Sequence, residues 1–162
     1  MLLTTLFVAG QVYAAAPKTI TLKNGTNETI GSVTLTPMAK GVRMNVEISK
    51  LPPGEHAFHF HETGTCTAPK FESAGGHFAP GTKGHGFDAA EGYHAGDMAN
   101  IIVGADGKVK VEFINANVTL DKGPNSLMKT GGTALVIHEK ADDYKSQPAG
   151  NAGGRLACGE IK

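Results

Sequence analysis

Hydrophobic and polar residues alternate along much of this chain with a period of two, which is typical of half-buried β-strands. The clearest example is the segment 42–48, where Val42, Met44, Val46 and Ile48 are separated by polar residues. Successive side chains of a strand point to opposite faces of a sheet, so these four residues would share the buried face. Similar runs predict about eight strands. They are 19–22, 28–36, 42–48, 56–61, 100–103, 108–114, 133–138 and 155–161.

Turn-forming residues separate these runs, and no segment has a convincing helical period. Asn24-Gly25, Pro52-Pro53-Gly54 and Asp106-Gly107 lie between consecutive runs, and the last is a strong hairpin signal. A slip in the alternation at Gly31-Ser32 indicates a β-bulge. The segment 134–137 is apolar throughout, so we expect it to be buried on both faces. These features predict an all-β fold, an eight-stranded antiparallel barrel or sandwich.

Two long segments, 62–97 and 139–154, interrupt this pattern. Loops of more than about a dozen residues are uncommon in a compact domain unless they serve a function. The first is rich in glycine and poor in apolar residues, so it buries too little surface to order itself. We therefore expect two functional loops, the first of which needs an additional source of order.

Length and charge narrow the classes of protein that fit. The chain has 162 residues, enough for one domain with its own core. Its 15 basic side chains balance its 15 acidic ones, which argues against a general nucleic-acid or anionic-membrane partner.

The start of the chain and its two cysteines suggest export. Residues 1–16 combine an apolar run with small residues at 14–16, as at the end of a signal peptide, although a positively charged start is missing. The run is too short to span a bilayer. We assign 17–162 to the folded domain. Cys66 and Cys158 are the two cysteines, and an even number in an exported chain favours one disulfide over two buried thiols.

Histidines are the main chemical signal. His59 and His61 flank Phe60 in a predicted strand, so their side chains would project from the same face about 7 Å apart at the base. From that separation two imidazoles can reach one ion at about 2 Å. His77, His85, His94 and Asp97 follow in the first loop, and His138 ends the buried strand.

These seven side chains have too many donors for a single ion. Neutral imidazoles suit copper and zinc, and an added carboxylate fits a closed tetrahedral zinc site. One shared histidine would turn the seven donors into two four-coordinate sites. The spacing does not identify the shared histidine.

Several short motifs, spread over the whole predicted domain, resemble one known family. They are His59-Phe60-His61-Glu62, Gly75-Gly76-His77-Phe78, His85-Gly86, His94-Ala95-Gly96-Asp97, Ala134-Leu135-Val136-Ile137-His138 and Gly150-Asn151-Ala152-Gly153-Gly154-Arg155-Leu156-Ala157-Cys158-Gly159. In content and order they resemble copper/zinc superoxide dismutase in its exported bacterial form. The resemblance implies a Greek-key barrel that converts superoxide to oxygen and hydrogen peroxide and protects the periplasm.

The resemblance also implies two ligand sets that meet at one residue. Copper would be held by His59, His61, His77 and His138, and zinc by His77, His85, His94 and Asp97. His77 would therefore bridge the two ions and carry a proton to the product.

Further residues gain roles by the same resemblance. Arg155 would position the anionic substrate, and Cys66 would form a disulfide with Cys158. Asp142 would connect one ligand of each metal, namely His61 and His85. His56 would be structural rather than a ligand.

The resemblance leaves some questions open. The loop after His138 is shorter than in eukaryotic members and lacks their charged guidance segment, so steering residues other than Arg155 are not identified. Lys70, Lys83 and Lys129 are candidates, but each is better explained as solvated surface. Whether the chain forms a homodimer is also open.

Other functions fit the sequence less well. A copper or zinc storage or delivery protein would not need Arg155. A zinc hydrolase needs an open coordination position and a general base. A purely structural zinc domain would not need His59 and His61.

Overall fold

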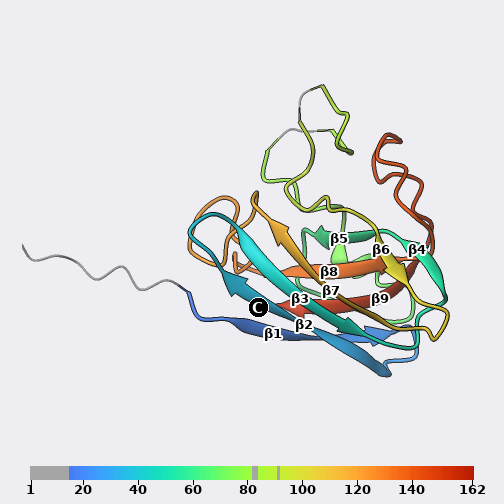
Figure 1. The fold of residues 1–162 in the computed structure, drawn as a ribbon. Coiled ribbons are helices and arrows are strands. Elements are labelled where there is room, and N and C mark those ends of the chain that lie inside the picture. The colour runs from blue at the N-terminus through green and yellow to red at the C-terminus, as the bar shows by residue number, and fades with distance from the viewer. Residues whose placement is uncertain (1–14, 82–83, 91) are drawn as a thin grey trace, which may run out of the picture.

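The computed structural model describes residues 15–81, 84–90 and 92–162, so the predicted signal segment 1–16 lies almost entirely outside the described residues. Nearly all regular structure in this part of the chain is β (Figure 1). The strands are β1 (Lys18–Asn24), β2 (Thr29–Pro37), β3 (Val42–Ile48), β4 (Gly54–His56), β5 (Phe58–His61), β6 (Ile101–Val103), β7 (Val109–Asn115), β8 (Thr133–His138) and β9 (Arg155–Ile161). One 3-10 turn, η1 (Glu72–Ala74), lies in the first long loop.

The strands form one large curled sheet and one small sheet (Figure 1). The large sheet has the order β5-β8-β9-β1-β2-β3-β7, and the small sheet pairs β4 with β6. Every pair is antiparallel. After β3 the chain crosses to the opposite edge of the large sheet before it forms β5, as Greek-key connections do. The predicted all-β antiparallel architecture is therefore confirmed.

The segment 56–61, predicted as one strand, is divided at Ala57. The Ala57 N–H donates to the carbonyl of Lys140 at 2.8 Å, and the N–H of His138 donates to the carbonyl of Ala57 at 3.0 Å. Because these bonds engage Ala57 at the end of β8, β4 on one side pairs with β6 and β5 on the other pairs with β8. Counting β4 and β5 as one predicted strand gives the eight that the pattern indicates.

The predicted β-bulge and the predicted hairpin turn are both present, the bulge displaced by one residue. The bulge lies beside the predicted place: Leu22 pairs with Gly31 and Lys23 pairs with Thr29, so Ile30 is the extra residue. Asp106-Gly107 does form the turn between β6 and β7, and Gly107 adopts a φ of 72°, which suits glycine.

The main core lies inside the curled sheet, and β8 is buried on both of its faces. All six residues of β8 are buried, which confirms the expectation for 134–137. One face packs on the main core, and the other carries Ala134 and Val136 against Phe71 and Ala74 of the first loop. Burying a large aliphatic or aromatic side chain stabilises the fold by about 1.5–3 kcal/mol, so β8 is a firm base for the residue that ends it. Among the described residues no helix has the length and hydrophobicity to cross a membrane.

Candidate metal centre

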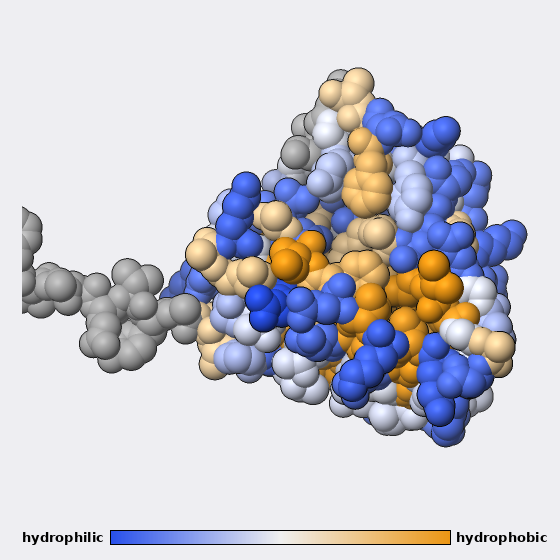
Figure 2. Space-filling model, in the orientation of Figure 1, coloured by the Kyte–Doolittle hydropathy of each residue, from blue (hydrophilic) through white to orange (hydrophobic). Residues whose placement is uncertain are grey.

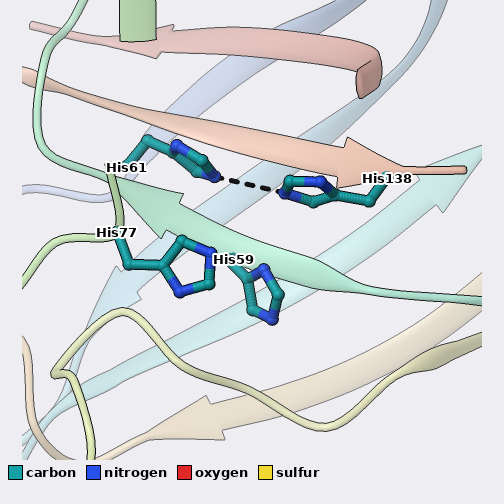
Figure 3. A group of neighbouring side chains, drawn as sticks. All are labelled: His59, His61, His77 and His138. Atoms are coloured by element: carbon teal, nitrogen blue, oxygen red, sulfur yellow. Dashed lines mark hydrogen bonds between the residues drawn. The ribbon is translucent and has the colours of Figure 1, made fainter. Parts of the chain in front are cut away.

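Two neighbouring strands bring three histidines together. His59 and His61 project from β5, and His138 ends the antiparallel partner β8. Figure 3 shows the rings of His61 and His138 pointing toward one another, with their Nε2 atoms 3.2 Å apart. All three side chains are buried. The same-face arrangement predicted for His59 and His61 is thus present.

The first loop adds His77 to this group. The loop backbone lies along β5: Phe78 N–H donates to the carbonyl of Phe60 at 2.8 Å, and Phe60 N–H donates to the carbonyl of Gly96 at 3.0 Å. This pairing places the His77 ring beside that of His59, with 4.1 Å between ring centroids (Figure 3). His59, His61, His77 and His138 each then offer one donor atom, and all four atoms lie within 4.8 Å of one another. We call these residues the strand group.

A second set lies on the other side of His77 and comes entirely from the first loop. His77, His85, His94 and Asp97 offer four donor atoms within 4.8 Å of one another, and we call these residues the loop group. Asp97 Oδ1 is its centre, at 2.8 Å from His77 Nδ1 and 3.2 Å from Nδ1 of both His85 and His94. The other oxygen of Asp97 accepts the backbone N–H groups of Gly86 and His94. His77 belongs to both groups.

Unpartnered ring nitrogens show that metal ions fit these groups. Among the described residues, no hydrogen-bond partner exists for the buried atoms His59 Nδ1, His77 Nε2 and His85 Nδ1. Buried polar atoms in native proteins nearly always have a partner, so three such atoms converging on two donor clusters call for ligands that the protein itself does not supply. Four imidazoles suit copper or zinc, and three imidazoles with a carboxylate suit zinc.

Burial keeps three histidines of the strand group, His61, His77 and His138, neutral. Desolvation lowers the pKa of His138 to about 3 and that of His77 to about 4, although the hydrogen bond to Asp97 partly opposes the shift of His77. Desolvation also holds the pKa of His61 well below its usual value. A neutral imidazole has a free electron pair, so these residues can bind a metal ion near pH 7 without first losing a proton.

Asp97 of the loop group and its neighbour Asp142 remain negatively charged and favour the charged form of His85. Burial would raise the pKa of Asp97 and Asp142, but hydrogen bonds from histidines outweigh it and hold both pKa values well below the usual range. Burial likewise would lower the pKa of His85, yet its hydrogen bond to Asp142 and the nearby negative charge of Asp97 raise it to about 9. The loop group therefore combines negative charge with imidazoles, a donor set suited to a divalent cation.

Asp142 connects the two groups, but through a different histidine from the one predicted. Its two oxygens lie 2.8 Å from His59 Nε2 and 2.9 Å from His85 Nε2, whereas the expected link was between His61 and His85. The expectation for His61 is wrong because β5 and β8 are antiparallel, so His59 lies nearer the end of β8 from which the second loop departs. The Nδ1 of His61 instead faces the carbonyl of Gly75 at 2.9 Å.

Arg155 lies beside the strand group. It begins β9, donates from Nη1 to the carbonyl of Phe71 at 2.6 Å and from Nη2 to that of Gly75 at 2.7 Å. A cavity of about 460 Å³ is lined by Arg155 together with His61, His77 and His138. Burial lowers the pKa of the guanidinium, which remains charged at neutral pH because its usual pKa is above 12. The cavity therefore joins a fixed positive charge to the strand group.

None of the other candidate cations can be assigned to this cavity. Lys129 lines a separate cavity near residues 15–18, and Lys70 is exposed and lines neither. Lys83 lies outside the described residues.

The disulfide and the non-ligand histidine agree with expectation. Cys66 is joined to Cys158 with 5.7 Å between their Cα atoms, so the start of the first loop is tied to β9. His56 directs Nδ1 at the carbonyl of His138 (2.8 Å) and Nε2 at that of Pro52 (2.9 Å), which leaves neither nitrogen for a metal.

Two side-chain amides near the metal groups were not foreseen. Asn100 pairs with the backbone of Asp142: its Oδ1 accepts the Asp142 N–H at 2.9 Å and its Nδ2 donates to the Asp142 carbonyl at 3.1 Å. Gln147 pairs with the backbone of His85 in the same way. Isolated amides that join two segments outside the strands carry no periodic or motif signal, so sequence patterns could not single them out.

Comparison with known proteins points to one family. A family model described as "Copper/zinc superoxide dismutase (SODC)" matches residues 29–161. A Cu-Zn superoxide dismutase of Aquifex aeolicus is 55% identical over 141 residues, covering 86% of this chain and 83% of that protein.

Solved structures agree. A double mutant of a SOD-like protein from Bacillus subtilis is similar with a TM-score of 0.87 and 40% identity, covering 91% of this chain and 99% of the other. The Cu/Zn superoxide dismutase from Brucella abortus gives a TM-score of 0.74 at 27% identity, with coverage of 90% and 99%. This chain therefore belongs to the copper/zinc superoxide dismutase family, whose members dismutate superoxide with copper and zinc.

Proposed function

We propose that the strand group binds copper, that the loop group binds zinc, and that His77 bridges the two ions. The observation that carries this proposal is the pair of four-donor clusters sharing one histidine whose outer nitrogen, Nε2, has no partner among the described residues. The donor sets support the division: the strand group offers imidazoles alone, and the loop group adds the carboxylate of Asp97.

The bound ions would supply complementary chemistry, since copper alternates between two oxidation states and zinc adds positive charge without redox activity. The overall reaction converts two superoxide anions and two protons to one molecule of oxygen and one of hydrogen peroxide. The protein must therefore admit a small anion, hold it next to the strand group and provide a proton.

Arg155 is suited to hold the anion. Its guanidinium is fixed by the carbonyls of Phe71 and Gly75 and lies on the wall of the cavity that reaches His61, His77 and His138. Two of its donors are used by these carbonyls, and the remaining N–H groups can face the substrate. A positive charge on the wall of a cavity also raises the rate at which anions arrive.

His77 is suited to carry the proton. Its Nδ1 lies 2.8 Å from Asp97 Oδ1, which fixes the ring orientation, and its Nε2 has no protein partner among the described residues. His77 also lines the cavity, so a proton held at Nε2 lies within reach of a product formed there.

The setting of the reaction is part of the proposal. The Cys66–Cys158 disulfide suits an oxidising compartment, and the apolar segment at the start of the chain resembles a signal peptide. We propose that the protein is exported and protects the periplasm from superoxide.

Metal analysis combined with a superoxide-consumption assay tests this function. The purified chain, reconstituted with both metals, is expected to bind about one copper and one zinc ion and to consume superoxide catalytically. Binding of both ions without turnover would instead indicate a metal-storage protein.

A further inference from the structure

The side chain of Gln147 forms two hydrogen bonds with the main chain of His85. Its Oε1 accepts the His85 N–H at 2.8 Å, and its Nε2 donates to the His85 carbonyl at 2.9 Å. Among the described residues, no other group hydrogen-bonds to the main chain of His85. One carboxamide from the second long loop thus occupies both polar groups of a residue in the first.

We infer that Gln147 is a positioning residue for His85 and thereby raises the affinity of the loop group for zinc. This inference rests on the proposed function, because it takes His85 to be a zinc ligand. Gln147 would act on the loop group through His85, since its amide hydrogen-bonds to the backbone of that residue rather than to a donor atom. Its Nε2 also donates to the carbonyl of Lys145 in its own loop, at 3.3 Å.

The surroundings of His85 explain why its backbone needs support. His85 lies in a loop, and its ring is held at Nε2 by Asp142, 2.9 Å away, which leaves Nδ1 for an ion. A ring fixed at one end still changes the place of Nδ1 if its backbone shifts. Gln147 fixes that backbone, so ring and main chain together define where Nδ1 lies.

The two long loops meet closely at this point. Gly86 has a φ of 91°, and a Cβ placed there would lie 1.9 Å from the carbonyl oxygen of Tyr144, so only glycine allows the contact. The backbones of the two loops are therefore in close contact next to His85. Gln147 supplies the hydrogen bonds that orient one backbone against the other.

Removing this contact should weaken zinc binding without removing a ligand. Loss of groups that orient a metal ligand usually lowers metal affinity by about 10- to 100-fold. For Gln147→Ala we expect the zinc dissociation constant to rise about 10-fold, which corresponds to about 1.4 kcal/mol. The absorption spectrum of cobalt(II) bound in place of zinc should also change, because it reports the geometry of the ligands.

Ser146→Ala provides a matched control in the same loop. Ser146 Oγ donates to Asp143 Oδ2 at 2.6 Å and accepts from Asn151 Nδ2 at 2.8 Å, so this change loosens the loop without touching His85. We expect Ser146→Ala to keep the zinc affinity and cobalt spectrum of the parent. An equal loss of affinity in both variants would show a general effect of loop stability and would overturn the inference.

A measurement on the metal-free protein tests the contact independently of the ligand assignment. Hydrogen exchange of the His85 amide should accelerate in Gln147→Ala, while Gln147→Glu, which retains an acceptor oxygen, should preserve protection. Unchanged exchange in Gln147→Ala would contradict the positioning role.

His85→Ala separates this inference from the proposed function. If His85→Ala keeps the zinc affinity of the parent, His85 is no ligand and the proposed assignment fails, and with it the stated effect on affinity. If His85→Ala releases zinc but Gln147→Ala binds it as the parent does, only the role of Gln147 is overturned.

Discussion

The strand group and the loop group share His77 but are built in different ways. Three of the four residues of the strand group lie on β5 and β8, which pair with each other and pack on the core. All four residues of the loop group lie between 77 and 97, outside the named strands. The strand group is ordered by the sheet, whereas the loop group depends on contacts that lie outside it.

Side-chain hydrogen bonds and a disulfide, rather than strand pairing, order the loop group. Asp97 gathers three histidines and two backbone N–H groups, and Asp142 ties His85 to His59 of the strand group. The Cys66–Cys158 disulfide anchors the start of the loop to β9. We infer that zinc completes the order of the loop, while copper binds to a surface that is largely prepared by the fold.

The largest effect is expected from the strand group. His138→Ala removes a buried imidazole at the end of β8, so we expect copper to be lost and superoxide consumption to fall to the background rate. The loop group loses no donor, so zinc should stay bound. Metal analysis with an activity assay checks both, and full turnover of this variant would show that His138 is not needed for the reaction.

The reciprocal change tests the loop group. His94→Ala removes a donor of the loop group that is not part of the strand group. If this group holds zinc as proposed, zinc should dissociate and the amides of 77–81, 84–90 and 92–97 should exchange faster with solvent. Amides of β5 and β8 should keep their protection, because those strands are held by the core. Equal loss of protection in loop and strands would show that the two groups are not ordered independently.

The stability of the metal-free protein should depend on pH in opposite directions for the histidines with lowered pKa values and for His85, whose pKa is raised. His77 and His138 have folded pKa values of about 4 and 3, below the unfolded value of about 6.5, so the unfolded chain binds more protons and stability falls as the pH drops from about 6.5 to 4. The loss should be on the order of 3 kcal/mol for each of these two histidines. His85 has a folded pKa of about 9, so its contribution is present below 6.5 and is lost between 6.5 and 9.

Urea unfolding at a series of pH values measures the loss of stability both below and above about pH 6.5. We expect maximal stability of the metal-free chain near the unfolded histidine pKa. Stability that stays constant between pH 6.5 and 4.5 would contradict the neutral, desolvated state of His77 and His138.

A smaller effect is expected from Arg155, which contacts neither group as a ligand. Arg155→Ala should leave both metals bound and lower turnover about 10-fold, equivalent to ~1.4 kcal/mol of transition-state stabilisation. Arg155→Lys should restore part of the rate through its charge, without the fixed geometry of the guanidinium. The difference between parent and Arg155→Ala should narrow at high ionic strength, since salt screens attraction of the anion. Unchanged turnover at low salt would favour metal storage.

Local sequence patterns predicted most of the strands and the features that follow directly from strand geometry. The alternation in 42–48, the apolar run 134–137 and the Asp106-Gly107 turn each specify structure through neighbouring residues, and all three are as expected. The His59–His61 pair also follows from strand geometry alone.

Contacts between distant segments were harder to predict. The break at Ala57 depends on its bonds to Lys140 and His138, and the partner of Asp142 depends on the direction in which β5 and β8 pair. The sharing of His77 could be inferred only from resemblance, because the spacing of the histidines is compatible with several choices. Such features are set by tertiary packing, which no local period encodes.

Anomalous scattering at the copper and zinc absorption edges, on crystals of the reconstituted protein, tests the division between the groups most directly. We expect a copper peak among His59, His61, His77 and His138, and a zinc peak among His77, His85, His94 and Asp97. Both peaks should lie within bonding distance of the His77 ring. Copper in the loop group, zinc in the strand group, or a His77 ring that contacts only one ion would contradict the assignment.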